Sequence, residues 1–208
     1  MRQRNVKNKK EIINNSSYIV QNPKEYRGKW HSVFDNNNPI HIEIGMGKGD
    51  FIRQNAKIYP DINFIGIEKF DSIMAIAIKK IDEDLPNLKL IRMDAIDINE
   101  VFDHEISLLY LNFSDPWPKP RHEKRRLTSS NFLQRYEDIF LNNKIIAMKT
   151  DNRGLFEYSL ISFSQNGYKI EDISLDLHHS NHTDNIMTEY EVKFSEKNNV
   201  IYYVNVVK

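Results

Sequence analysis

An acidic and aromatic turn followed by a dense basic segment is the part of the sequence best suited to chemistry. Asp115-Pro116-Trp117 comes directly after the apolar segment 106–113, and residues 119–126 contain five basic side chains. Lys and Arg can neutralise phosphates, Trp117 can stack on a nucleobase, and Asp115 can accept hydrogen bonds from base N–H groups. A basic segment alone is about as often a solvated loop. The adjoining Asp-Pro-Trp favours a site that holds a nucleobase together with its phosphates.

A glycine-rich turn lies upstream, where the apolar segment 40–44 runs into Gly45-Met46-Gly47-Lys48-Gly49. Glycines allow a tight turn and a close approach of the backbone to a ligand, and the helix predicted to begin at Asp50 supplies free N–H donors. The dinucleotide pattern G-x-G-x-x-G needs a glycine at position 50, so a pyrophosphate ligand is disfavoured. Glu43 adds negative charge beside the turn, which suits a cationic ligand such as S-adenosylmethionine.

Acidic residues also follow the next two predicted strands. Glu68 stands 23 positions after Gly45, a distance at which an acid accepts hydrogen bonds from the ribose of an adenosine-type cofactor. Asp94 follows segment 88–93 and could reach the adenine amino group. A single strand-end acid is more often an ordinary polar cap. Three at successive strand ends, Glu43, Glu68 and Asp94, form a series that chance rarely gives.

The elements that must position these residues alternate along the chain. The pattern predicts strands at 40–44, 62–67, 88–93, 106–113, 144–149, 168–174 and 200–206, and helices at 50–58, 71–81, 129–140, 154–165 and 188–195. Such alternation is typical of an α/β fold with a mostly parallel sheet and helices on both faces. The last two strands lack a long crossover helix between them, which predicts an antiparallel final strand.

Several short motifs follow one another along the chain after residue 28. They are Glu43-Ile44-Gly45-x-Gly47-x-Gly49, Gly66-Ile67-Glu68, Asp115-Pro116-Trp117-x-Lys119, Arg121-His122, Lys124-Arg125-Arg126, Lys149-Thr150-Asp151 and Thr188-x-Tyr190-Glu191. In these motifs the chain resembles the single-subunit bacterial tRNA (guanine-N7)-methyltransferases, and the block from Asp115 to Arg126 is highly specific to them. Ser114, where many members carry proline, and Glu123, inside the basic run, are the two departures. They bear on loop shape and phosphate affinity only.

The resemblance implies a Rossmann-like class I methyltransferase fold with a seven-stranded sheet, S-adenosylmethionine as cofactor and tRNA as partner. The guanosine at position 46 in the tRNA variable loop is the implied target. We expect a basic, flexible arm at residues 1–25 and a catalytic domain at 26–208. The implied cofactor residues are Glu43, Gly45, Gly47, Gly49, Glu68, Asp94 and Asp115. The implied substrate residues are Lys119, Asp151, Thr188, Tyr190 and Glu191, and the implied RNA-contacting loop consists of Arg121, His122, Lys124, Arg125 and Arg126.

Transfer of a methyl group to guanine N7 needs no base, because N7 carries a lone pair and no proton. Positive charge moves onto the purine during the reaction, so a carboxylate at the N1–H and N2–H edge of the base is stabilising. Asp115 is the first choice for this catalytic role, with Asp151 and Glu191 as competitors.

Composition agrees with this interpretation. The 208 residues suffice for one domain and include no cysteine, which excludes disulfides and thiolate chemistry. No apolar run approaches the roughly 20 residues of a membrane span, so we expect a soluble, cytoplasmic protein, as a monomer or a homodimer. Metal binding is not expected, although His178, His179 and His182 cluster in one segment.

The formal net charge is zero, but the charges are unevenly distributed. Segments 1–10 and 119–126 each hold five basic side chains, and the remainder of the chain has 19 Lys and Arg against 28 Asp and Glu. An acidic body with two basic segments steers a polyanion to one region and repels it elsewhere. The first segment is as well explained by a solubilising tail.

Three other functions compete with this hypothesis. An adenine amino-methyltransferase usually carries Asp-Pro-Pro before its aromatic residue, whereas here Trp117 follows Pro116 directly. A nicotinamide oxidoreductase would share Glu68 but would need a glycine in place of Asp50. A non-catalytic RNA-binding module would keep the basic segments and have no use for the strand-end acids.

Overall fold

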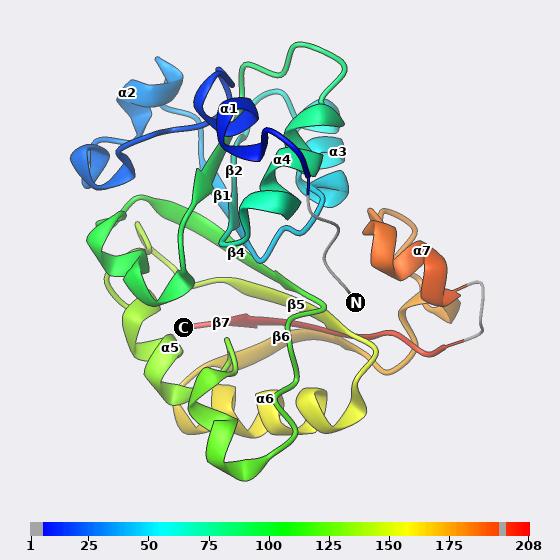
Figure 1. Cartoon of the computed structure of the whole chain (residues 1–208). Helices are drawn as coiled ribbons and strands as arrows, with labels where there is room; N and C mark the ends of the chain where they lie inside the picture. Colours follow the sequence, from blue (N-terminus) through cyan, green and yellow to red (C-terminus); the bar gives the residue numbers. More distant parts are fainter. Residues whose placement is uncertain (1–5, 196–198) are drawn as a thin grey trace.

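The computed structural model describes residues 6–195 and 199–208 and shows one seven-stranded sheet with helices on both faces (Figure 1). The strand order is β3-β2-β1-β4-β5-β7-β6, and the predicted α/β class is confirmed. The strands are β1 (Ile40–Ile44), β2 (Asn63–Glu68), β3 (Leu88–Arg92), β4 (Ile106–Asn112), β5 (Ile146–Thr150), β6 (Lys169–Ser174) and β7 (Tyr202–Val207).

Strands β1 to β5 pair in parallel, and β7 runs antiparallel between β5 and β6. The antiparallel last strand is therefore as predicted. Every residue of β2 and β5 is buried, as expected for central parallel strands covered on both faces. The carboxyl ends of β1, β2, β4 and β5 meet at one edge of the sheet, and their loops form the candidate site.

Two apolar cores lie on opposite faces of the sheet. The larger one includes Trp30, Tyr136 and Phe163, contributed by the amino-terminal region, α5 and α6. The smaller one includes Ile52 and Met74 from α3 and α4. The helices are α1 (Lys9–Asn14), α2 (His31–Phe34), α3 (Asp50–Ile58), α4 (Asp71–Lys79), α5 (Ser130–Tyr136), α6 (Arg153–Gln165) and α7 (Glu189–Ser195), with 3₁₀ turns η1 (Pro23–Tyr26), η2 (Ala95–Glu100), η3 (Pro120–Arg125) and η4 (Leu177–His179).

The helix predicted at 129–140 ends early, at Tyr136, and this prediction was wrong in length. The carbonyl oxygen of Ile139 instead accepts hydrogen bonds from the backbone N–H groups of Glu105 and Ile106, and Phe140 forms a β-bridge with Ile106. The chain is thus drawn out beside the start of β4. None of the helices within 6–195 is long and apolar enough to cross a membrane.

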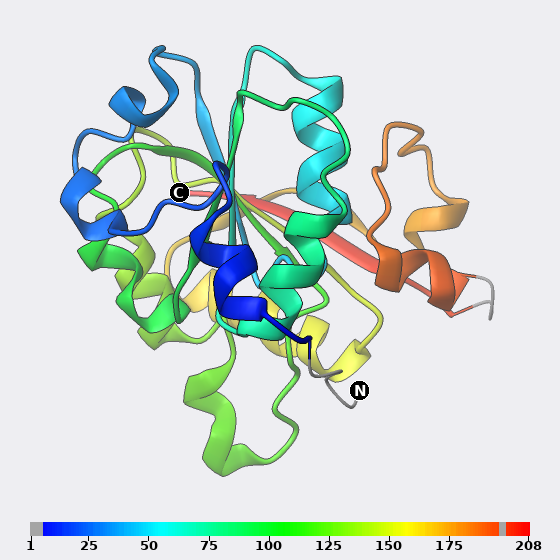
Figure 2. The same cartoon turned by 45° about the horizontal axis from the view of Figure 1, so that its top comes forward.

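The amino-terminal segment packs on the domain from α1 onward. Figure 2 shows α1 beside α4, and Ile13 of α1 is buried in the smaller core. The backbone N–H of Val20 donates to Leu90 of β3, and that of Leu90 donates to Tyr18, at 3.1 and 2.8 Å. This pairing covers the β3 edge of the sheet. Residues 1–5 lie outside the described residues, so the predicted arm at 1–25 and its separation from a domain at 26–208 stay predictions.

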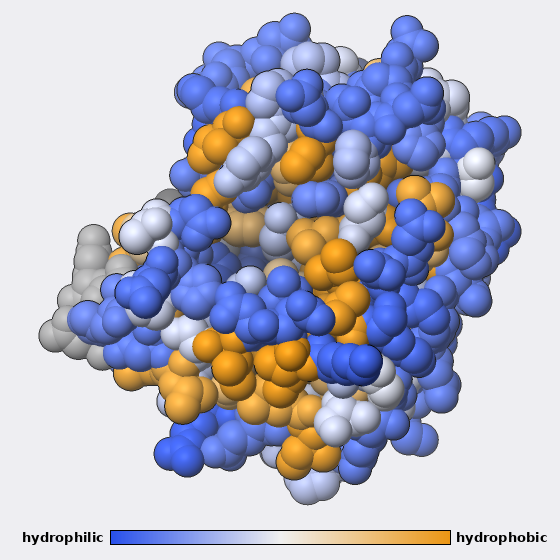
Figure 3. Space-filling model, turned by 180° about the vertical axis from the view of Figure 1, so that it is seen from behind, coloured by the Kyte–Doolittle hydropathy of each residue, from blue (hydrophilic) through white to orange (hydrophobic). Residues whose placement is uncertain are grey.

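Strand β6 forms the opposite edge of the sheet. Ile170 and Ile173 of β6 are 50% and 43% exposed, and Leu175 just after the strand is 65% exposed. Figure 3 shows the molecule from behind, with apolar side chains gathered mainly in the lower half of that face. Lys169, Glu171 and Asp172 alternate with these apolar residues and place charge on the edge, which is a common protection against edge-to-edge pairing.

Candidate functional site

The glycine turn after β1 opens toward free space. Gly45 and Gly47 have φ of +75° and +59°, which L side chains rarely adopt, and an added Cβ at either position would meet nothing within 4 Å. The backbone N–H groups of Gly45 and Met46 donate to the Ile67 carbonyl at 2.9 and 3.0 Å, which ties the turn to β2. The turn therefore leaves room for a ligand directly against its backbone.

Gly49 serves packing. Its φ is +77°, and a Cβ there would lie 3.3 Å from the Cβ of Ala77 in α4. The glycine thus permits α3 to begin close against α4. The cofactor role predicted for Gly49 stays a prediction, and the structure supplies a packing reason for the residue.

Glu68 joins the glycine turn to the loop after β2. Its Oε1 accepts from the Phe70 backbone N–H at 2.9 Å, and its Oε2 accepts from that of Gly47 at 3.3 Å. Burial raises the pKa of this carboxyl, and the backbone hydrogen bonds oppose that rise. The contact with Gly47 places Glu68 directly beside the turn.

Glu43 lies beneath the glycine turn and is almost fully buried. The Asn112 side chain donates to its Oε1 at 2.9 Å, while its Oε2 makes no hydrogen bond within the described part of the chain. Burial raises the pKa of Glu43 to about 7, despite the Asn112 hydrogen bond and the nearby charge of Lys149. A buried carboxylate oxygen without a partner is unusual and points to a ligand that supplies the missing donor.

A pocket of about 540 Å³ lies at the carboxyl ends of β1 to β4. It brings together four of the predicted cofactor residues, Gly45, Glu68, Asp94 and Asp115. Asp94 also caps η2, because it accepts from the Ile96 backbone N–H at 3.2 Å. The apolar part of the lining was not predicted from the sequence, because apolar side chains give no local sign of a binding site. It consists of Ile44, Ile67, Phe70, Met93, Ile96, Phe113, Leu127 and Phe132.

The Asp115 turn has a strained backbone and is stabilised by Arg126. Phe113 and Trp117 have φ of +50° and +41°, a conformation that costs a non-glycine residue about 1 kcal/mol or more. Arg126 donates to the carbonyl oxygens of Pro116 and Trp117 at 3.0 and 3.1 Å. Its guanidinium also lies 4.1 Å from the ring centre of Tyr158. Arg126 therefore stabilises the turn, and its predicted part in RNA contact stays a prediction.

The remaining basic residues of the loop are presented outward. Lys119, Arg121, Lys124 and Arg125 are exposed on and beside η3, and in Figure 2 the segment carrying η3 projects at the lower edge of the molecule. Lys124 and Arg125 also line the pocket of Asp115. The guanidinium of Arg125 lies 4.9 Å from the Trp117 ring centre, whose other neighbour is the His122 ring at 5.7 Å.

Two further predicted substrate residues, Tyr190 of α7 and Asp151 after β5, meet at the same edge of the sheet. The Tyr190 hydroxyl donates to Asp151 Oδ2 at 3.2 Å, just after β5. The Tyr190 ring stacks on Phe194 at 4.1 Å and contacts Phe113 at 5.0 Å between ring centres. Because Phe113 precedes the Asp115 turn by two residues, Tyr190 and Asp151 adjoin the candidate site.

Glu191 is buried in an ion pair. It is fully enclosed and accepts hydrogen bonds from Lys149 Nζ at 2.8 Å and Asn185 Nδ2 at 2.7 Å, with His178 Nε2 at 2.9 Å. Burial would raise the pKa of Glu191, but Lys149 holds it below its usual range. Thr188 caps the same helix, because its Oγ1 accepts from the Glu191 backbone N–H at 2.9 Å. Substrate contact by Thr188 and Glu191 stays a prediction.

The three clustered histidines take three different carboxylates as partners. His178 pairs with Glu191, His179 with Asp176 at 2.9 Å and His182 with Asp172 at 2.6 Å. Each of the three rings is thus paired with a carboxylate of its own. Within residues 6–195 and 199–208, no group of three or more His, Cys, Asp or Glu side chains is placed to hold a metal ion.

A second pocket, of about 360 Å³, lies on the α3 face of the sheet. Aromatic rings of His41, Phe51 and Tyr110 line it, and the Tyr110 ring contacts each of the other two edge to face or nearly so. Burial lowers the pKa of His41 to about 4, so the imidazole is neutral at cellular pH. Asn112 at the end of β4 and Lys149 near the end of β5 also line this pocket.

Comparisons with known proteins identify the family. A family model described as a putative methyltransferase matches residues 37–204. A tRNA (guanine-N(7)-)-methyltransferase of Oceanobacillus iheyensis is 55% identical over 97% of this chain and 96% of its own length. One of Bacillus subtilis (strain 168) is 53% identical over 94% of this chain and 92% of its own length.

Solved structures agree on the fold. An antibiotic-related methyltransferase superposes with a TM-score of 0.64 at 16% identity, covering 87% of this chain and 92% of its own. The 16S rRNA methyltransferase KamB gives 0.62 at 13% identity, over 86% and 92%. A 16S rRNA (adenine(1408)-N(1))-methyltransferase solved with its cosubstrate SAM gives 0.58 at 10% identity, over 90% and 92%. With the near full-length identity to the two relatives, these findings show that the chain belongs to the tRNA (guanine-N7)-methyltransferase family.

Proposed function

We propose that the protein transfers a methyl group from S-adenosylmethionine to N7 of a guanosine in tRNA. The observation that carries the proposal is the pocket that joins Gly45, Glu68, Asp94 and Asp115, because it opens beside a projecting basic loop. The substrate named for the two bacterial relatives supports the same assignment. The target would be the guanosine at position 46 in the variable loop. A tRNA substrate would place the protein in the cytoplasm.

The residues present fit a cationic adenosine cofactor. Open space lies against Gly45 and Gly47, and Glu68, which contacts Gly47, would accept from ribose hydroxyls. The unpartnered Oε2 of Glu43 could accept from an amino group, and a bound cation would favour the charged form of this carboxyl. Asp94 would accept from the adenine amino group. The cofactor supplies an activated methyl group on a sulfonium.

Asp115 would act on the guanine itself. The guanine gains positive charge as its N7 forms the new bond, and a carboxylate at the N1–H and N2–H edge stabilises that charge. N7 carries no proton, so the reaction needs no histidine or lysine base. Holding N7 in line with the methyl carbon supplies the larger part of the rate.

The test is incubation of the pure protein with methyl-labelled S-adenosylmethionine and unmodified tRNA, followed by nucleoside mass spectrometry. We expect label in 7-methylguanosine, and in a tRNA variant without a guanosine at position 46 we expect none. Label in methyladenosine would overturn the assignment to guanine. Cofactor binding without transfer to any tRNA would overturn the proposed substrate.

A further inference from the structure

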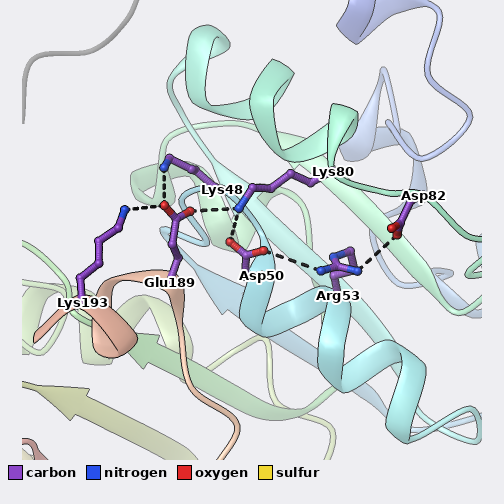
Figure 4. A network of polar contacts seen from close by, with 7 residues as sticks. All are labelled: Lys48, Asp50, Arg53, Lys80, Asp82, Glu189 and Lys193. Carbon is purple, nitrogen blue, oxygen red and sulfur yellow. Dashed lines mark hydrogen bonds and ion pairs between the residues drawn. The ribbon is translucent and has the colours of Figure 1, made fainter. Parts of the chain in front are cut away.

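Helix α7 is fastened to the glycine turn by a cluster of charges (Figure 4). Glu189, the first residue of α7, accepts from Lys48 Nζ at 2.6 Å and from Lys80 Nζ at 3.0 Å. Lys48 stands between Gly47 and Gly49 in the turn, and Lys80 caps the carboxyl end of α4. The first contact spans 141 positions of sequence, so it joins two parts of the fold that are distant along the chain.

The cluster continues along α3. Lys80 also donates to Asp50 Oδ2 at 2.6 Å, and Asp50 Oδ1 lies 3.8 Å from the Arg53 guanidinium. The side chains of Lys48 and Glu189 are 32% and 28% exposed, so solvent screens them only in part. Burial alone would raise the pKa of Glu189, but the surrounding lysines hold it well below its usual range, so this carboxylate stays charged. A networked, partly buried pair contributes more than an isolated surface pair.

Two further residues of α7 reach the proposed guanine site. Tyr190 bonds Asp151 and touches Phe113, and Glu191 pairs with Lys149 at the end of β5. None of the described residues lining the 540 Å³ pocket belongs to α7. The helix therefore contacts the cofactor turn through Glu189 and the substrate side through Tyr190, without forming the cofactor pocket.

We propose that Glu189 is a positioning residue that fixes the substrate helix α7 to the cofactor turn through Lys48 and Lys80, so that an occupied cofactor site orders Tyr190 and Asp151 for the guanine. This inference rests on the proposed function. The coupling is reciprocal, because any ligand that steadies the turn also steadies the helix fastened to it. Glu189 touches neither cofactor nor guanine in this arrangement and acts through Tyr190.

Amide hydrogen exchange tests the link without any methyl transfer. In the parent, saturating S-adenosylmethionine slows exchange at least about threefold both in residues 45–49 and in residues 186–194. In Glu189→Gln, protection of 45–49 is kept and protection of 186–194 is lost. Lys193→Gln is the matched control: Lys193 also contacts Glu189, at 2.6 Å, but lies on the same helix, so this variant behaves like the parent. Equal protection of 186–194 in Glu189→Gln and parent, or none in either, overturns the proposal.

Single-turnover methyl transfer at saturating tRNA and cofactor supplies the second readout. We expect Glu189→Gln to lower the rate about tenfold with less than about threefold change in cofactor affinity. Lys48→Met combined with Glu189→Gln is no slower than the slower single variant, because both remove the same contact. Additive losses contradict the link. If the parent shows the exchange link but transfers no methyl group to tRNA, the proposed function fails and the link stands.

Discussion

At the scale of single residues, Asp115 lies in the open part of the pocket, exposed and on a turn fixed by Arg126. Replacing Asp115 with Asn keeps the size of the side chain and removes its charge. We expect the single-turnover methyl-transfer rate to fall at least about tenfold, or roughly 1.4 kcal/mol. The measurement is made at saturating tRNA and cofactor, with both dissociation constants determined separately. A retained rate with weakened binding would assign Asp115 to ligand positioning and favour Asp151.

Glu68 offers a test of the cofactor assignment. We expect Glu68→Ala to weaken S-adenosylmethionine binding by about 1 to 3 kcal/mol, because charge-assisted hydrogen bonds to the ribose are lost. Isothermal titration calorimetry measures the affinity, and circular dichroism checks that the fold is kept. Glu100→Ala, the same change on the exposed side of η2, is the control and leaves the affinity as it is. Unchanged affinity in a folded Glu68→Ala would remove Glu68 from the site.

Glu43 makes stability depend on pH in a definite direction. Its pKa is about 7 in the folded protein against an ordinary 4.5, so the folded state binds more protons between these values. The contribution of Glu43 to stability is full below about pH 4.5 and is lost as the pH rises through 7. At pH 8 the buried charge therefore costs about 3 kcal/mol, an order-of-magnitude value.

Urea denaturation of parent and Glu43→Gln at pH 5 and pH 8 measures this cost. We expect similar stabilities at pH 5 and a more stable variant at pH 8, and we expect the same variant to bind S-adenosylmethionine more weakly. The comparison between variant and parent removes the opposing contribution of His41, whose lowered pKa favours the folded state as pH rises. The stability difference between variant and parent is compared at the two pH values. If it is the same at pH 8 as at pH 5, the result contradicts the burial of a charge at position 43.

At the scale of elements, the basic loop divides into a supporting and a contacting arginine. Arg125→Ala removes an exposed side chain, so we expect weaker tRNA binding and unchanged stability of the fold. The slope of log tRNA affinity against log salt concentration should become smaller by about 0.7 to 0.9. Arg126→Ala removes the hydrogen bonds to Pro116 and Trp117, so we expect a loss of about 1 to 3 kcal/mol in stability. Fluorescence titrations of tRNA at several salt concentrations and thermal melts distinguish the two. Identical salt slopes for Arg125→Ala and the parent would show that the loop is merely solvated.

The elements themselves could largely be predicted from sequence. The bounds of β1 and α3 match the predicted segments, because a continuous apolar run and a glycine-bounded helical pattern mark them locally. The 3₁₀ turns were not predicted, since their conformation follows from tertiary contacts. Arg126 and Arg125 are neighbours of the same type, and their environments differ through tertiary contacts, chiefly the carbonyl groups of a turn about ten residues upstream that accept from Arg126.

At the scale of the whole molecule, the contacts of the site that could not be predicted from the sequence are those between residues far apart in the chain. The strand-end acids could be found from spacing, because parallel strands bring their carboxyl ends together. Lys48 and Glu189 carry no local signal, although Lys48 stands between two glycines and Glu189 sits within Thr188-x-Tyr190-Glu191. The contact between them forms only because the chain after β6 folds back to the glycine turn, and this path is a property of the three-dimensional structure.

The buried pair of Lys149 and Glu191 also constrains how this family can change over evolutionary time. Removing one partner leaves an uncompensated charge in a nearly enclosed site, at a cost of about 3 to 5 kcal/mol. Replacing both with apolar residues of similar size removes that charge and leaves only the smaller cost of the lost hydrogen bonds to Asn185, His178 and Ile186. We expect Lys149→Met to be strongly destabilised in urea denaturation and the Lys149→Met and Glu191→Met double variant to recover most of the loss. A double variant as unstable as the single one would contradict this. Each single step crosses a fitness valley, so positions 149 and 191 should be inherited as a unit and should covary across related sequences.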